Sequence, residues 1–142
     1  MSIRQVLAVV ATIIGLIAVP LEASARQAPL VDPERVLMIN VTPNPMTAAQ
    51  VRGAIVAGGR EHGWYVTEDK PGQVTLRYDR GGKHTAIITV DYDDKGYQIR
   101  YASSVNLNYE EVNGVREIHP NYNRWIQILI RSINANANAA PR

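Results

Sequence analysis

The sequence predicts an α+β fold, in which a four-stranded antiparallel meander carries two helices packed on one face, with an extra strand near the N-terminus. Four consecutive segments between residues 64 and 101 alternate apolar and polar residues, the pattern of half-buried strands. Short turns rich in Gly and Asp separate these segments, and helical apolar periodicity precedes and follows them. These three observations indicate two layers of secondary structure around one core.

The N-terminal residues have the three-part pattern of a secretory signal peptide. Arg4 provides a positive charge, residues 6–19 are apolar except for Thr12, and Ala23 to Ala25 form the small-x-small pattern of a cleavage site. The apolar run is shorter than the roughly 20 residues of a transmembrane helix, which favours cleavage over a retained anchor. We therefore expect a periplasmic or secreted protein with no integral membrane span after cleavage.

Composition divides the 142-residue chain into four parts. We expect a signal peptide over 1–25, a proline-rich extended segment over 26–45, a single α+β domain over 46–134, and a flexible Asn/Ala tail over 135–142. Within the extended segment, residues 36–39 are predicted to add a strand. The chain has no cysteine and a formal net charge of +2. This excludes disulfide staples and thiol catalysis, and the balanced charge does not favour a nucleic acid partner.

Each predicted helix has start signals of its own. Thr47 and Gln50 form a capping box before the first helix, and Gly63 is suited to the position just after its end. Pro120 is suited to the first position of the second helix, with His119 as its cap. The apolar stripe of the second helix contains Tyr122, Trp125, Ile126, Leu129, Ile130 and Ile133.

Turn lengths predict the register of the meander. A three-residue turn at 81–83, a four-residue turn at 93–96 and the loop around 71–72 place all apolar side chains on one face. The predicted pairs are Val66–Leu76, Leu76–Ile88, Tyr78–Ala86, Tyr92–Tyr97 and Ile88–Tyr101. A slip of one residue would reverse every side chain. The opposite face carries the polar residues Arg77, Asp79, Thr89, Asp91 and Arg100, so we expect it to be solvated or to meet a polar partner.

The closing part of the sequence, Ile118-His119-Pro-Asn121-Tyr122-Asn123-Arg-Trp125, follows Ser104-Val-Asn106-Leu-Asn-Tyr109. With the Gly63-Trp64 step and the meander, it resembles a family of small uncharacterised envelope proteins of Gram-negative bacteria, many of them lipoproteins. The resemblance spans roughly residues 47–133 and implies an envelope location but no activity. This chain departs from the family by lacking a lipobox cysteine and by a longer stretch over 110–117.

Amides and aromatic rings gather in the same region and are the candidate binding residues. They are Asn106, Asn108, Tyr109, His119, Asn121 and Tyr122. Such groups recognise sugars and peptides, which predicts an envelope protein or glycan as partner. The alternative is structural, because asparagines also stabilise turns and cap helices.

No catalytic residue, cofactor or metal ion is predicted. His62, His84 and His119 lie in different expected elements without ligand spacing. The stretch 91–96 begins like a calcium loop, but Lys95 and Ala102 stand where the fifth and twelfth ligands belong.

The sequence therefore favours a non-enzymatic envelope module that binds through a polar surface. The alternative is a small envelope hydrolase that uses His119 with a nearby carboxylate or serine. The position of the imidazole discriminates between them, because a catalytic ring lies in an open cleft beside a carboxylate whereas a capping ring lies against the helix end.

Overall fold

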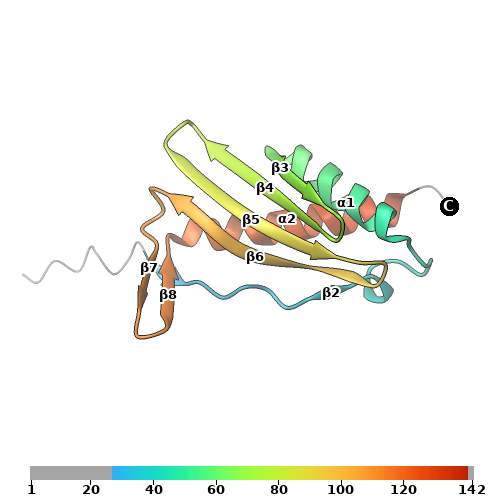
Figure 1. Cartoon of the computed structure of the whole chain (residues 1–142), viewed down its shortest axis with the longest axis horizontal. Coiled ribbons are helices and arrows are strands. Elements are labelled where there is room, and N and C mark those ends of the chain that lie inside the picture. Colours follow the sequence, from blue (N-terminus) through green and yellow to red (C-terminus); the bar gives the residue numbers. More distant parts are fainter. Residues whose placement is uncertain (1–26, 141–142) are drawn as a thin grey trace, which may run out of the picture.

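Two antiparallel sheets and two α-helices form the fold of residues 27–140, the part of the chain that the computed structural model describes (Figure 1). The expected α+β class, with two helices and antiparallel strands, is confirmed. The expected signal peptide lies outside the described residues.

The larger sheet has five strands in the order β2-β6-β5-β4-β3. Its long strands are β3 (Trp64–Lys70), β4 (Gln73–Arg80), β5 (His84–Tyr92) and β6 (Gly96–Val105). All five predicted residue pairs are observed between them. Bulges interrupt the ladders between Val66 and Glu68 and between Ile87 and Ile88, but the apolar residues stay on one face. The lengths of the turns were therefore enough to predict which residues of neighbouring strands pair.

The fifth strand extends the predicted four-stranded meander and lies where an extra strand was expected, within residues 36–39. Strand β2 (Val36–Leu37) pairs with the start of β6, where Val36 lies opposite Tyr97. It is shorter than the strand expected over 36–39, because the chain turns at Met38 into the 3-10 helix η2 (Met38–Asn40). The backbone N–H groups of Val41 and Thr42 both donate to the Met38 carbonyl oxygen at 2.9 Å, which closes the turn.

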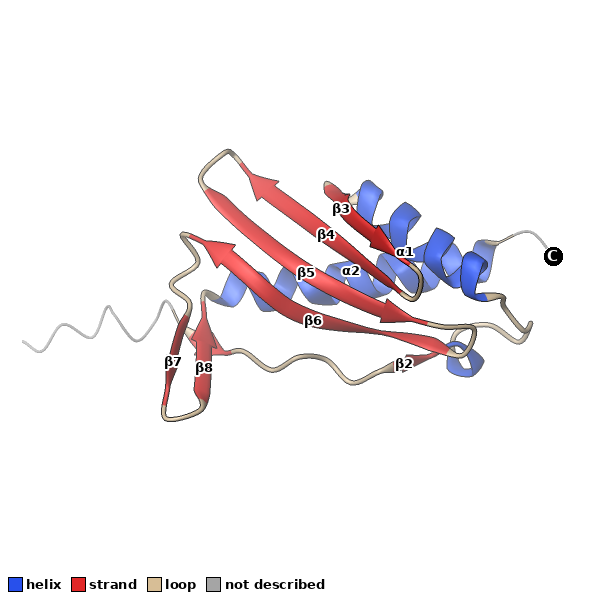
Figure 2. Ribbon diagram, viewed as in Figure 1, coloured by secondary structure: helices blue, strands red, loops and turns tan. Residues whose placement is uncertain are grey.

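A second, three-stranded sheet was not predicted. It has the order β1-β8-β7, formed by β1 (Ala28–Pro29), β7 (Glu110–Val112) and β8 (Val115–Ile118). Asn113 and Gly114 join β7 to β8 with positive φ angles of 52° and 77°, as the tight two-residue hairpin turn requires. Figure 2 shows this hairpin extending away from one end of the larger sheet.

Both α-helices cover the same face of the larger sheet (Figure 2). Helix α1 (Ala48–Glu61) begins at the predicted capping box of Thr47 and Gln50, and Gly63 follows its end with φ of 83°. Helix α2 (Pro120–Ala139) begins with Pro120 after His119, as predicted. All residues of its predicted apolar stripe are buried except Ile130, which is partly exposed.

Helix α2 continues past the point where we expected a flexible tail. It ends at Ala139 rather than near Asn134. Tertiary contacts hold the added turn, because the Tyr97 hydroxyl donates to Asn134 Oδ1 at 2.7 Å and Asn136 Nδ2 donates to Glu61 Oε1 at 3.1 Å. Ala137, the residue after Asn136, is buried. The low-complexity Asn/Ala composition gave no indication of these contacts, so the sequence predicted a flexible tail instead of a helix.

The uncovered face of the larger sheet is polar, as expected, and its charges are paired. Asp79 accepts hydrogen bonds from Arg77, Tyr65 and Thr85, and these three donors hold the pKa of its carboxyl well below the usual range. Asp91 accepts a hydrogen bond from Arg100 Nε at 3.1 Å. Arg77 and Asp79 are both in β4, whereas the bonds of Tyr65 and Thr85 to Asp79 and of Arg100 to Asp91 join neighbouring strands and link the sheet laterally.

Among residues 27–140, no helix combines the length and apolarity needed to cross a bilayer.

Candidate functional site

The predicted binding residues begin in the loop after β6, where two asparagines adopt left-handed conformations. The φ angles of Asn106 and Asn108 are 58° and 51°. Asn106 Nδ2 donates to the Lys83 carbonyl oxygen at 2.7 Å, and the Asn106 carbonyl oxygen is 2.8 Å from His84 Nδ1. Asn106 therefore connects this loop to the β4–β5 turn. Asn108 is exposed, and its carbonyl oxygen accepts a bond from Gln27 at 3.2 Å.

Tyr109 and Tyr122 meet through a third ring, Tyr101. Tyr109 stacks on Tyr101 with ring centroids 4.6 Å apart, and Tyr122 meets Tyr101 edge-on at 5.6 Å. Tyr109 is half-buried and donates from its hydroxyl to Glu111 at 3.2 Å, whereas Tyr122 is buried. Burial raises the pKa of both phenols, and for Tyr109 the Glu111 carboxylate adds to the effect. Both hydroxyls are thus neutral at pH 7.

His119 and Asn121 meet at the start of α2. His119 Nδ1 accepts a hydrogen bond from the Asn121 backbone N–H at 3.1 Å, and the His119 backbone N–H donates to the Leu107 carbonyl oxygen at 2.7 Å. The imidazole is half-buried against the first helical turn. Within the described part of the chain, no carboxylate or side-chain hydroxyl forms a hydrogen bond or ion pair with His119. The imidazole therefore lies in the capping position, which is the arrangement expected if His119 is structural and not catalytic.

Asp32 organises this region, although the sequence analysis did not single it out. Its Oδ1 accepts from the Tyr101 backbone N–H at 2.8 Å, and its Oδ2 accepts from Arg116 at 3.1 Å. This contact raises the pKa of Arg116 and ties the N-terminal segment to both sheets. Asp32 lies between Val31 and Pro33 in a segment without hydrophobic periodicity. The sequence therefore contained no sign that its carboxylate would contact both sheets.

Three exposed valines form a second feature that the sequence analysis missed. We call Val31, Val112 and Val115 the valine row; they are 74%, 63% and 59% exposed. Val112 lies directly opposite Val115 in the β7–β8 ladder. Val31 lies outside β1, one residue after Leu30, whose N–H donates to the Arg116 carbonyl oxygen at 2.9 Å. Two of the three valines are therefore directly opposed across the β7–β8 hairpin, and the third lies on the N-terminal segment that leaves β1.

Acidic residues accompany the valine row. Glu110 and Glu117 lie directly opposite each other, two positions from Val112 and Val115, and so on the same face of the smaller sheet. Like charges in directly opposed positions destabilise a sheet, which makes this end of the face favourable for a cation.

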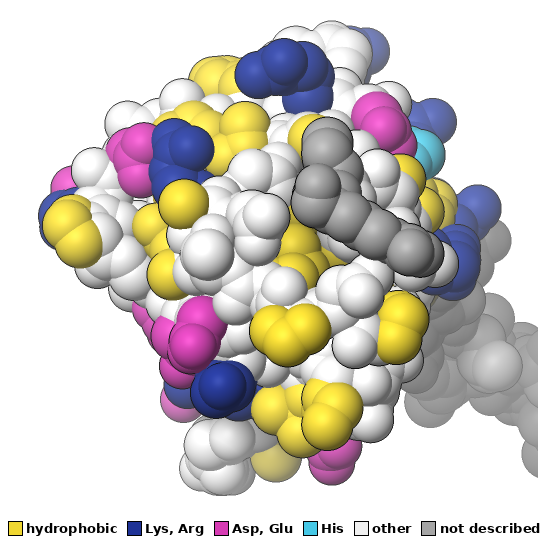
Figure 3. Space-filling view, turned by 90° about the vertical axis from the view of Figure 1, so that its right-hand side faces the viewer, with side chains coloured by type: hydrophobic (Ala, Val, Ile, Leu, Met, Phe, Trp, Pro, Cys, Tyr) yellow, Lys and Arg dark blue, Asp and Glu magenta, His cyan; other side chains and the backbone are white. Residues whose placement is uncertain are grey.

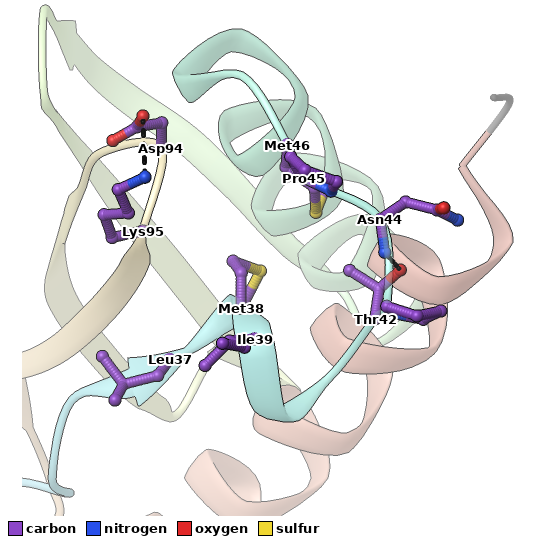
Figure 4. A pocket seen from close by; sticks show the side chains of 10 residues that line it. Leu37, Met38, Ile39, Thr42, Asn44, Pro45, Met46, Asp94 and Lys95 are labelled. Carbon is purple, nitrogen blue, oxygen red and sulfur yellow. Dashed lines mark hydrogen bonds and ion pairs between the residues drawn. The ribbon is translucent and has the colours of Figure 1, made fainter.

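An apolar pocket of about 450 Å³ lies at the other end of the molecule, beside η2. Met38 and Met46 extend toward each other inside it, with Leu37 and Ile39 on one side and the Asp94–Lys95 turn on another (Figure 4). Figure 3 shows apolar side chains gathered among polar ones on this end of the molecule. Most residues that line this pocket come from the segment predicted as extended, with a strand expected over 36–39, and no sequence pattern indicated a pocket there.

The residues from 27 to 140 contain no cluster of three or more His, Asp or Glu side chains arranged to hold a metal ion. Comparisons with protein-family models, with curated proteins and with solved structures find no match to this chain. The resemblance to small Gram-negative envelope proteins stays a prediction.

Proposed function

We propose that the chain is an exported, non-enzymatic module of the bacterial envelope, periplasmic or secreted, that holds another envelope protein on its smaller sheet. The valine row carries this proposal. Single exposed apolar side chains are ordinary, but contiguous ones rimmed by polar groups are typical of protein interaction sites. Val31, Val112 and Val115 are all more than half exposed, and Val112 lies directly opposite Val115 in the register.

The surroundings of the row support the same interpretation. Interfaces combine an apolar centre with a polar rim. Asn108 and Tyr109 directly precede β7, while Glu110 and Glu117 lie on the face of the row. Two of the predicted binding residues, Asn108 and Tyr109, are therefore proposed as rim residues. For Asn106, His119, Asn121 and Tyr122 we propose the structural role that their hydrogen bonds and burial favour.

The geometry of His119 favours a binding module over the hydrolase alternative. Its Nδ1 accepts the Asn121 N–H, so this nitrogen is engaged in the cap and is not available as a base. A hydrolase would need the ring in an open cleft beside a carboxylate or a nucleophile.

The test is recovery of crosslinked partners from intact cells with the double variant Val112→Ser/Val115→Ser. Val105→Ser is the matched control, because Val105 is also more than half exposed but lies at the end of β6, outside the row. We expect the double variant to lose a specific crosslinked protein that the control retains, with the unfolding free energy unchanged within about 0.5 kcal/mol.

An unchanged set of crosslinked proteins in the double variant would contradict the proposal. Retention of an envelope glycan that depends on Asn108 and Tyr109, but not on the valines, would instead move binding to the predicted polar surface.

A further inference from the structure

The pocket beside η2 has an apolar interior and an apolar mouth. Met38 and Met46 are almost fully buried, whereas Leu37 is 43% and Ile39 83% exposed. Methionine side chains adapt to irregular ligands because they are unbranched and polarisable. Apolar surface thus continues from the interior to the outside, as a ligand with an aliphatic chain would require.

Hydrogen bonds and prolines preform the pocket wall. The Met38 N–H donates to the Lys95 carbonyl oxygen at 2.8 Å, which fixes η2 against the β5–β6 turn. Pro43 and Pro45 restrict φ in the segment that leads to α1, and buried Thr42 accepts the Asn44 N–H at 3.3 Å. A wall that is already ordered reduces the entropic cost of binding.

The mouth of the pocket carries one charge of each sign. The Asp94 and Lys95 side chains are 55% and 80% exposed and form an ion pair at 3.6 Å (Figure 4). The neighbouring Asp93 is different, because it accepts bonds from Arg35 and from the N–H groups of Lys95 and Gly96. An exposed ion pair contributes little to stability, so a ligand can replace it, with Lys95 complementary to a phosphate and Asp94 to an ammonium group.

We propose that this pocket binds the single aliphatic chain of a zwitterionic lysophospholipid, with the head group at Asp94 and Lys95. The volume of about 450 Å³ lies in the lower half of the range for small-molecule sites, which favours one chain over two. The pocket adjoins β2, at the opposite end of the larger sheet from the β7–β8 hairpin (Figure 1). The inference is therefore independent of the proposed protein partner.

The probe is lysophosphatidylethanolamine with a 14-carbon chain, titrated below its micelle concentration into protein purified from cells that express the full chain. We expect saturable binding of one lipid per chain by calorimetry and native mass spectrometry. The double variant Leu37→Ser/Ile39→Ser should weaken binding about tenfold or more, because it removes apolar surface at the mouth. Val112→Ser, in the valine row, should bind like the wild type.

Head-group recognition is tested with Asp94→Asn and Lys95→Ala. Each should weaken binding of the zwitterionic lipid several-fold while leaving binding of a neutral alkyl maltoside unchanged. All four substituted positions are at least partly exposed, so thermal unfolding should match the wild type.

Four results would overturn the proposal: no saturable binding; binding that the Leu37/Ile39 variant retains; equal affinity for a fatty acid, which lacks the ammonium group; or binding to bilayer vesicles alone. The last result would indicate a membrane surface instead of a single lipid.

Discussion

The two sheets of this molecule differ in how many of their apolar residues are buried: the smaller sheet buries Ile118 in the core but exposes its valines. The larger sheet buries Val74, Leu76 and Ile88 under α1 and α2, so that they are at most 1% exposed. The smaller sheet leaves the valine row more than half exposed. Burial of apolar area is the main stabilising term of a fold, whereas exposed apolar area is available to a partner. We therefore attribute most of the stability to the larger sheet and propose that the smaller sheet binds a partner.

The largest expected effect is on the covered face of the larger sheet. Ile88→Ala removes a fully buried side chain and should lower the free energy of unfolding by about 2–5 kcal/mol. Thr89→Ala is the control, because Thr89 is the next residue of β5 and faces the uncovered side; it should cost less than about 1 kcal/mol. Denaturant titration measures both. Similar losses would show that the two faces do not differ in burial as described.

The contact between the helices gives the next effect. A Cβ added at Gly58 would lie 2.6 Å from the Ile133 nitrogen and 2.8 Å from its Cα, so α1 and α2 would have to separate. We expect Gly58→Ala to cost about 1–3 kcal/mol. Gly53→Ala is the matched control in the same helix, because nothing lies within 4 Å of its added Cβ.

Gly53→Ala should stabilise the protein by about 0.5–1 kcal/mol through helix propensity. If Gly58→Ala were also stabilising in thermal unfolding, the close approach of the helices would be wrong.

The same contrast explains what the sequence predicted. The strands β3 to β6 are seven to ten residues long and are joined by short turns, so alternation and turn length determined both the buried face and the register. The strands of the smaller sheet have two to four residues, too few for a period to be recognised. Moreover, β1 pairs with β8 from the opposite end of the sequence.

The candidate site was predictable in part for the same reason. The cap at His119 follows from local sequence, because Pro120 marks the first helical position. The stacking of Tyr109 on Tyr101 and the bonds of Asp32 depend on long-range contacts that no local pattern contains. The stretch 110–117 stood out only as longer than the pattern that the chain resembles, and it forms the β7–β8 hairpin.

A smaller effect is expected at the helix start that joins the two sheets. His119→Ala removes the side-chain acceptor of the Asn121 N–H and should cost about 1 kcal/mol. Thr47→Ala, at the capping box of α1, provides a comparison of similar size. A His119→Ala variant with an unchanged melting temperature would remove the capping role and reopen the hydrolase interpretation.

The smallest expected effect concerns pH and the uncovered face. Arg77, Tyr65 and Thr85 lower the pKa of Asp79 in the folded state, so its contribution to stability is present above the unfolded-state pKa of about 3.9. This contribution is lost as the pH falls toward the lower folded-state pKa. Asp79→Asn should therefore make the loss of stability between about pH 4 and 2 less steep. Identical slopes in acid titrations of the two proteins would contradict this role.

Site-specific photocrosslinking in intact cells tests most directly whether binding and stability belong to different sheets. A photoreactive amino acid is placed at position 112 in the valine row, or at position 89 on the uncovered face of the larger sheet. We predict a discrete adduct with another envelope protein from position 112, lost when Val31 is changed to Ser, and none from position 89. The same adduct from both positions, or an adduct from position 89 alone, would contradict the assignment of binding to the smaller sheet.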